Sequence, residues 1–148
     1  MSSVIPLGIL AIICGAMIAV QASTNQVLLQ HTGNIFWTAI MLFSLGLVTL
    51  LMLALVTGAD RPSFSQLQLA PNWSFLGGIV VASYVVVITF LVPKLGVANA
   101  ILLIVFGQIF AAVLIDHFGW FNVEITKIGI ERLAGIALML AGVYLARH

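Results

Sequence analysis

The sequence predicts an all-α integral membrane protein that crosses the bilayer five times. Hydrophobic residues make up 63% of its 148 residues, and charged residues only 6%. A soluble domain carries about 25% charged residues, because it needs them to cover its surface. The apolar runs are continuous and do not alternate as the strands of a lipid-facing barrel do, so helices are the expected spanning structures.

Five apolar runs approach the roughly 20 residues that a helix needs to span the hydrocarbon core. We expect one membrane domain over 1–148, with helices at about 4–29, 35–56, 73–92, 97–115 and 128–146. The last run is the weakest, since its uncharged part, 133–146, is short for a crossing. Its full length brings Glu131 and Arg132 to the membrane edge, where the arginine can snorkel and the two charges can neutralise each other.

The first run ends in the polar stretch "QASTNQVLLQ", residues 21–30, which allows two interpretations. The stretch either marks the helix end at the headgroups or is the polar face of a helix that continues. Gln21 and Asn25 lie one helical turn apart on one face. Beside them runs a ladder of small residues that favours close helix packing: Ala11, Gly15, Ala19 and Ser23. This order favours a helix that continues to about Leu29, with Gln21 and Asn25 as substrate-binding residues.

Later runs add further polar candidates. Gln108 lies near the middle of the fourth run, where its amide either bonds to another helix or contacts a substrate. Ser83 and Tyr84 lie near the centre of the third run and are further candidates for substrate binding. Tyr84 either reaches Gln108 or lines a cavity, and Ser83 either contacts the substrate or bonds back to its own helix. Asp116 ends the fourth run without an adjacent basic residue, so it is either a solvated interfacial group or an ion or gating site.

The motifs of several function classes are missing from the sequence. It has no phosphate-binding glycine loop, no metal-ligand spacing and no nucleophile beside a base, so we expect neither an enzyme nor a bound metal or cofactor. It has no basic cluster that would bind nucleic acid. The expected partners are the lipid bilayer and a small-molecule solute.

The distribution of Lys and Arg gives no clear orientation. With five crossings, Arg61, Lys127 and Arg132 fall on one side of the membrane, and Lys94 and Arg147 on the other. An excess of one positive residue is too small for the positive-inside rule to predict an orientation. The chain is therefore either oriented by another signal, or inserted both ways and paired with an inverted copy. The second alternative would give a ten-helix, inverted-repeat bundle of the kind that transporters use.

Several strings resemble the YdcZ-like family of small five-helix bacterial inner-membrane proteins in the drug/metabolite transporter superfamily. They are "QASTNQVLLQ", "FSLG" at 43–46, "GQIFAAVLIDHFGWF" at 107–121 and "ERLAGIALMLAGVYLAR" at 131–147. The resemblance covers essentially the whole chain, and the segment from Gly107 to Gly119 is its most specific part. The last helix, with Gly135 and Gly142, resembles the terminal helix common in the superfamily, which implies a packing role for these glycines.

The resemblance implies a transporter in the bacterial inner membrane that works as an antiparallel homodimer or with an inverted paralogue. The related small multidrug exporters carry a glutamate in their first helix, whereas this chain has Gln21 and Asn25 as its polar groups there. We therefore expect a secondary transporter that exports a small polar or amphipathic solute by alternating access. The alternative is a non-transporting small membrane subunit that stabilises or regulates a partner.

Overall fold

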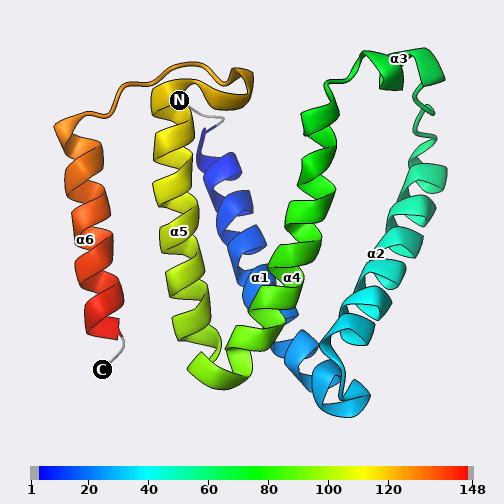
Figure 1. Ribbon diagram of the computed structural model, residues 1–148, viewed down its shortest axis with the longest axis horizontal. Helices are drawn as coiled ribbons and strands as arrows, with labels where there is room; N and C mark the ends of the chain where they lie inside the picture. The colour runs from blue at the N-terminus through cyan, green and yellow to red at the C-terminus, as the bar shows by residue number, and fades with distance from the viewer. Residues whose placement is uncertain (1–3, 147–148) are drawn as a thin grey trace. The chain divides into compact units, whose positions relative to one another are not determined.

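The computed structural model describes residues 4–146, which fold almost entirely as helices (Figure 1). In chain order these are α1 (Val4–Thr32), α2 (Ile35–Thr57), α3 (Phe64–Leu69), the short 3₁₀ helix η1 (Asn72–Phe75), α4 (Leu76–Leu95), α5 (Val97–Phe118), the 3₁₀ helix η2 (Trp120–Asn122) and α6 (Ile130–Ala146). The described residues contain no β-strand. The predicted all-α class is therefore confirmed.

Four stretches of the described chain are long and apolar enough to cross a membrane. They are Ile5–Thr32, Ile35–Thr57, Asn72–Leu95 and Val97–Phe118, which correspond to α1, α2, η1 with α4, and α5. Helix α6 has 17 residues and is not among them. The chain is thus a multi-pass membrane protein with four clear candidate spans.

The chain divides into two compact units, one ending at Pro93 and the other beginning at Lys94. In the first unit α1 and α2 contact each other next to the turn that joins them. Figure 1 shows the two helices diverging from this turn, and α3 lying in the connection from α2 to α4. Three long helices therefore form the framework of the first unit.

The turn between α1 and α2 is held by hydrogen bonds from its own neighbours. Gly33 adopts a φ of 64°, which a glycine tolerates without strain. Oδ1 of Asn34 then accepts hydrogen bonds from the backbone N–H groups of Phe36 at 2.9 Å and Trp37 at 3.2 Å, so Asn34 caps α2. The hydroxyls of Thr32 and Thr38 lie 2.6 Å apart across the turn. The two helices are joined tightly without help from the rest of the chain.

Each long helix of the first unit contributes a few buried residues. On α4 these residues follow helical spacing and are Val85, Ile88, Thr89 and Val92. On α1 the buried residues are Ala22 and Asn25, and on α2 they are Thr38 and Ala39. Three of these eight side chains are polar, so the core of this unit contains hydrogen-bonding groups away from solvent.

In the second unit, α5 and α6 pack against each other and run antiparallel (Figure 1). The segment between them folds back onto the end of α5. There the Thr126 N–H donates to the carbonyl oxygen of Asp116 at 2.9 Å, and the Ile128 N–H donates to Nδ1 of His117 at 3.3 Å. Gly119 has a φ of 63°, and a Cβ there would lie 2.7 Å from Cγ1 of Ile125. The return of the chain therefore requires a glycine at 119.

Most apolar side chains point away from the packed surfaces. Val56 is 82% exposed and Leu138 is 72% exposed, and such side chains suit contact with lipid tails. Within their spans, only 6% of the best apolar window is buried in α1, α2 and α5, and 22% in α4. The described helices thus leave broad faces open to lipid or to another protein chain.

Candidate functional site

Asn25 on α1 is a fully buried amide, with 0% of the residue exposed. Its Nδ2 donates a hydrogen bond of 3.4 Å to Oγ1 of Thr89 on α4, which is 1% exposed. The two residues lie 64 positions apart in the chain. This bond therefore ties α1 to α4 inside the first unit.

The hydroxyl of Thr89 determines how the Asn25 amide is turned. Oγ1 of Thr89 donates its hydrogen to the carbonyl oxygen of Val85, one turn earlier on α4, at 2.7 Å. A hydroxyl carries a single hydrogen, so Thr89 can only accept from Asn25. The NH₂ group of Asn25 must face Thr89, and its carbonyl oxygen must face away.

Oδ1 of Asn25 is buried and accepts no hydrogen bond from any residue in the described range 4–146. A buried polar atom without a partner costs about 1–3 kcal/mol. The surroundings do not offer a charge: the first unit has only Asp60 and Arg61, both in the loop between α2 and α3. The site is therefore neutral, and its free acceptor can take a hydrogen bond from an N–H or O–H group.

The Asn25–Thr89 pair lies well inside its helices. Asn25 is about two turns from the end of α1 at Thr32, and Thr89 is slightly less than two turns from the end of α4 at Leu95. Either offset corresponds to roughly 10 Å of helix rise. The pair therefore lies within the two helices and not at their ends.

The other predicted binding residues of the first unit are placed differently. Gln21 lies one turn before Asn25 on α1 but is exposed. On α4, Ser83 is exposed and Tyr84 is half-buried. No hydrogen bond joins the side chains of these three residues to Asn25 within the described part of the chain. Their role in binding stays a prediction.

Gln108 belongs to the second unit, on the exposed side of α5. Its side chain makes no hydrogen bond with residues 4–146. An amide in hydrocarbon without a partner costs several kcal/mol. The contact of Gln108 with a solute stays a prediction.

Asp116, predicted as an ion or gating residue, forms an ion pair. Its Oδ2 lies 3.0 Å from Nη1 of Arg132, at the start of α6. The sequence interpretation, in which Arg132 neutralises its neighbour Glu131, is therefore wrong about the partner. The correct pair connects the end of α5 to the first turn of α6, a closeness that arises because the chain folds back between the two helices.

The residues predicted for helix packing are largely uncovered within one chain. Ala11, Gly15 and Ser23 are exposed, and Ala19 is half-buried. The Ser23 hydroxyl donates to the carbonyl oxygen of Ala19 on the same helix. Within the described residues, no atom of another helix lies within 4 Å of where a Cβ would be on Gly15, Gly135 or Gly142. A packing role for these residues stays a prediction.

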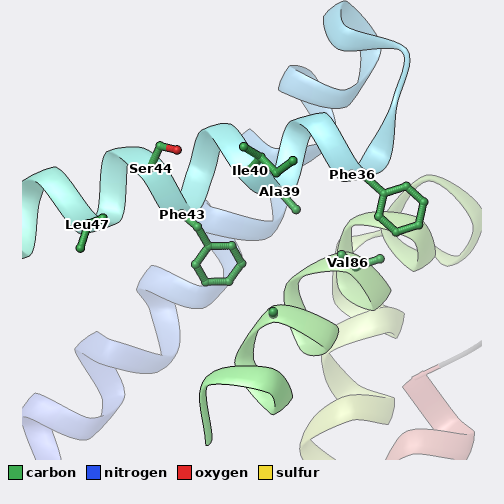
Figure 2. Close-up of a pocket in the computed structure, with 8 residues that line it drawn as sticks. Phe36, Ala39, Ile40, Phe43, Ser44, Leu47 and Val86 are labelled. Carbon is green, nitrogen blue, oxygen red and sulfur yellow. The ribbon is translucent and has the colours of Figure 1, made fainter. Parts of the chain in front are cut away.

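A groove of about 400 Å³ lies between α2 and α4 in the first unit. Figure 2 shows the rings of Phe36 and Phe43 projecting from α2 on the side where Val86 of α4 lies. The remaining lining residues are Ala39, Ile40, Ser44, Leu47 and Ala82. Ser44 is the one polar side chain of this lining, so the groove suits the apolar part of a solute.

Sequence reasoning missed Thr89 and the Asp116–Arg132 pair. A threonine in an apolar run usually bonds to its own helix, as Thr89 does with Val85, so its spacing gives no sign of a partner on α1. Asp116 and Arg132 lie 16 residues apart. Only the path of the segment between their helices brings them together.

A comparison with protein families matches residues 6–145 to the family described as "Putative inner membrane exporter, YdcZ". No curated protein and no solved structure matches the chain.

Proposed function

Because the chain belongs to the YdcZ family of inner membrane exporters, we propose that it exports a small polar or amphipathic solute and that Asn25 binds this solute. The protein is a multi-pass inner membrane protein and a transporter rather than an enzyme. The observation that carries the proposal is the buried, unpaired Oδ1 of Asn25. An N–H or O–H group of the solute would supply the missing donor.

Alternating access explains why an unpaired oxygen is useful. In the described state Oδ1 is closed off and unsatisfied, so this state is destabilised by about 1–3 kcal/mol at that atom. A state that opens the α1–α4 contact to solute would satisfy the oxygen. A solute shifts such an equilibrium only by the difference in its affinity for the two states. Binding at Oδ1 provides that difference.

We propose that the working unit is an antiparallel homodimer, with an inverted paralogue as the alternative partner. Gln21, Gln108 and Ser83 are exposed on helices that cross the membrane, and a second chain would cover them. The ladder that contains Gly15 is equally uncovered and suits close helix contact. The even distribution of Lys and Arg supports insertion in both orientations.

In this arrangement α6 provides the fifth crossing. Its 17 residues rise about 25 Å, which is close to the hydrocarbon thickness of about 30 Å. Arg132 in the first turn can extend to the headgroups while its helix stays in the lipid. Five crossings per chain give the inverted dimer ten helices.

The test compares export by the unmodified chain with export by Asn25→Leu. Cells that express either protein at equal level are compared by mass spectrometry of the small solutes in the medium. A solute that is enriched only with the unmodified chain is then loaded into proteoliposomes, and its efflux is measured. Gln30→Leu is the matched control, since Gln30 is an exposed amide on the same helix. Equal efflux from Asn25→Leu and the unmodified chain contradicts the proposal.

The uncovered small-residue ladder also favours a second candidate function, a non-transporting subunit that packs against a partner. Proteoliposomes that contain the purified chain alone separate the two functions. A transporter gives saturable flux of the identified solute, whereas a subunit gives none.

A further inference from the structure

The second unit contains a groove of about 510 Å³ between α5 and α6, with charges at one end only. Asp116 and Arg132 form that end. The remaining walls are Ile109, Ala112, Val113, Gly135, Ile136 and Met139. Ile109 and Met139 lie about two turns from the ion pair along their helices, which is roughly 10 Å. The groove therefore has a charged mouth and an apolar interior.

The ion pair leaves hydrogen-bonding capacity free. Only Nη1 of Arg132 and Oδ2 of Asp116 take part in the pair. Nη2 and Nε of Arg132 and Oδ1 of Asp116 make no hydrogen bond within residues 4–146. The side chains of Arg132 and Asp116 are 41% and 31% exposed. A ligand can thus reach one free acceptor and several free donors a few ångströms apart.

The mouth of the groove lies at the level where lipid headgroups are found. Asp116 is in the last turn of α5, and Arg132 is in the first turn of α6. The rings of Phe118 and Trp120 stack beside this helix end with centroids 5.2 Å apart. Aromatic rings at the end of a membrane helix typically mark the interface between hydrocarbon and headgroups.

We propose that this groove binds a zwitterionic phospholipid that has a primary ammonium group, with its headgroup on the ion pair and an acyl chain along the apolar wall. The ammonium donates to Oδ1 of Asp116, and the phosphate accepts from the free N–H groups of Arg132. The pair has no net charge, so a purely anionic headgroup is repelled by Asp116 and a purely cationic one by Arg132. Charge complementarity therefore selects a zwitterion.

Neighbouring charges do not change this selection. Glu124, Lys127 and Glu131 are exposed charged residues close in sequence to the mouth of the groove, and none of them lines it. Because they are exposed, salt screens their charges. The lipid site does not depend on the proposed export function, since it needs only residues of the second unit.

The test offers the purified full-length chain three phospholipids with identical acyl chains, carrying ethanolamine, choline or glycerol headgroups. Bound lipid is counted by native mass spectrometry. The choline headgroup has a trimethylated nitrogen without an N–H, so it cannot donate to Asp116. We expect about two- to five-fold more bound ethanolamine lipid than choline lipid, the range typical of one partly exposed charged contact.

Variants then test whether the preference for the ethanolamine lipid depends on the Asp116–Arg132 pair. Asp116→Asn and Arg132→Gln should each reduce the preference to equal binding. The exchange of both charges, Asp116→Arg with Arg132→Asp, keeps a zwitterionic pair and should retain the preference, which separates loss of the site from loss of the fold. Lys127→Gln is the control and should change nothing. Ile136→Phe fills the groove beyond the pair and should lower the binding of all three lipids.

Several outcomes would overturn the proposal. An unchanged preference in Asp116→Asn means that the headgroup does not contact this carboxylate. Preferential binding of the glycerol lipid means that Arg132 acts as a simple anion site. If Ile136→Phe abolishes dimer cross-linking and leaves lipid binding intact, the groove is an interface between two copies of the chain.

Discussion

One polar pair connects α1 to α4 and another connects α5 to α6, but the two pairs differ in charge and burial. Asn25 and Thr89 are neutral and almost completely buried, and one amide oxygen is left unpaired. Asp116 and Arg132 are charged and partly exposed, so solvent and headgroups can form hydrogen bonds with the atoms that the ion pair leaves free. A buried neutral pair has large effects when it is changed, whereas an exposed ion pair has small ones. The first contact is suited to switching and the second to selective binding at the surface.

The largest effect is expected for Asn25→Leu. Leucine has the same branching and no polar atoms, so the substitution removes the unpaired oxygen, which is also the proposed binding group. Efflux of the identified solute should be lost, while the free energy of unfolding in mixed micelles rises by about 1 kcal/mol. Gln30→Leu should change neither quantity. A variant that loses both export and stability would show that Asn25 is a structural residue.

Thr89→Val removes the hydroxyl and keeps the shape of the side chain. Nδ2 of Asn25 then has no partner in a buried position. The free energy of unfolding should fall by about 1–2 kcal/mol. In the double variant with Asn25→Leu this loss should largely disappear, because no donor remains to be satisfied. Strictly additive effects in the four-protein cycle would mean that the two side chains do not interact.

Gly119→Ala tests the segment that carries the α5–α6 contact. An alanine at a φ of 63° is strained, and its Cβ would lie 2.7 Å from Cγ1 of Ile125. We expect the free energy of unfolding to fall by about 1 kcal/mol. Gly129→Ala is the matched control, since Gly129 has no positive φ and no atom near its Cβ position. Equal losses in the two variants would contradict a specific need for glycine at 119.

The smallest effect is expected for Asp116→Asn. Partly exposed ion pairs contribute about 0.2–1 kcal/mol, and salt screens them. The variant should unfold slightly more easily at low ionic strength, and its difference from the unmodified chain should shrink in about 1 M salt. A loss above about 2 kcal/mol would place the pair in a drier setting than its exposure indicates.

The fold class follows from composition, because nine charged residues cannot cover a soluble protein of this length. The helical character of the stretch after Gln21 also follows from its regular spacing, and α1 continues through it to Thr32. A crossing by α6 does not follow from composition alone, since its 17 residues are at the lower limit of a span.

The site is only partly visible in the sequence. Asn25 stands out because an amide in an apolar helix requires a hydrogen-bond partner. Helical spacing alone cannot tell Asn25 from Gln21, yet one is buried and the other exposed. The difference in their burial depends on where α4 contacts α1, and this contact joins residues far apart in the sequence. The ion pair of Arg132 is also a long-range contact: Glu131 is its neighbour in the chain, but its partner is Asp116 on α5.

The self-contained turn between α1 and α2 has a consequence for biogenesis. Its stabilising hydrogen bonds all involve residues between Leu29 and Thr38, so the hairpin can form as soon as its second helix leaves the ribosome. The chain from Val4 to Ala59 contains no Lys, Arg, Asp or Glu. The translocon would thus receive a finished hairpin that carries no charged residue, and Arg61, which follows it, would bias the side of the membrane on which the hairpin turn lies.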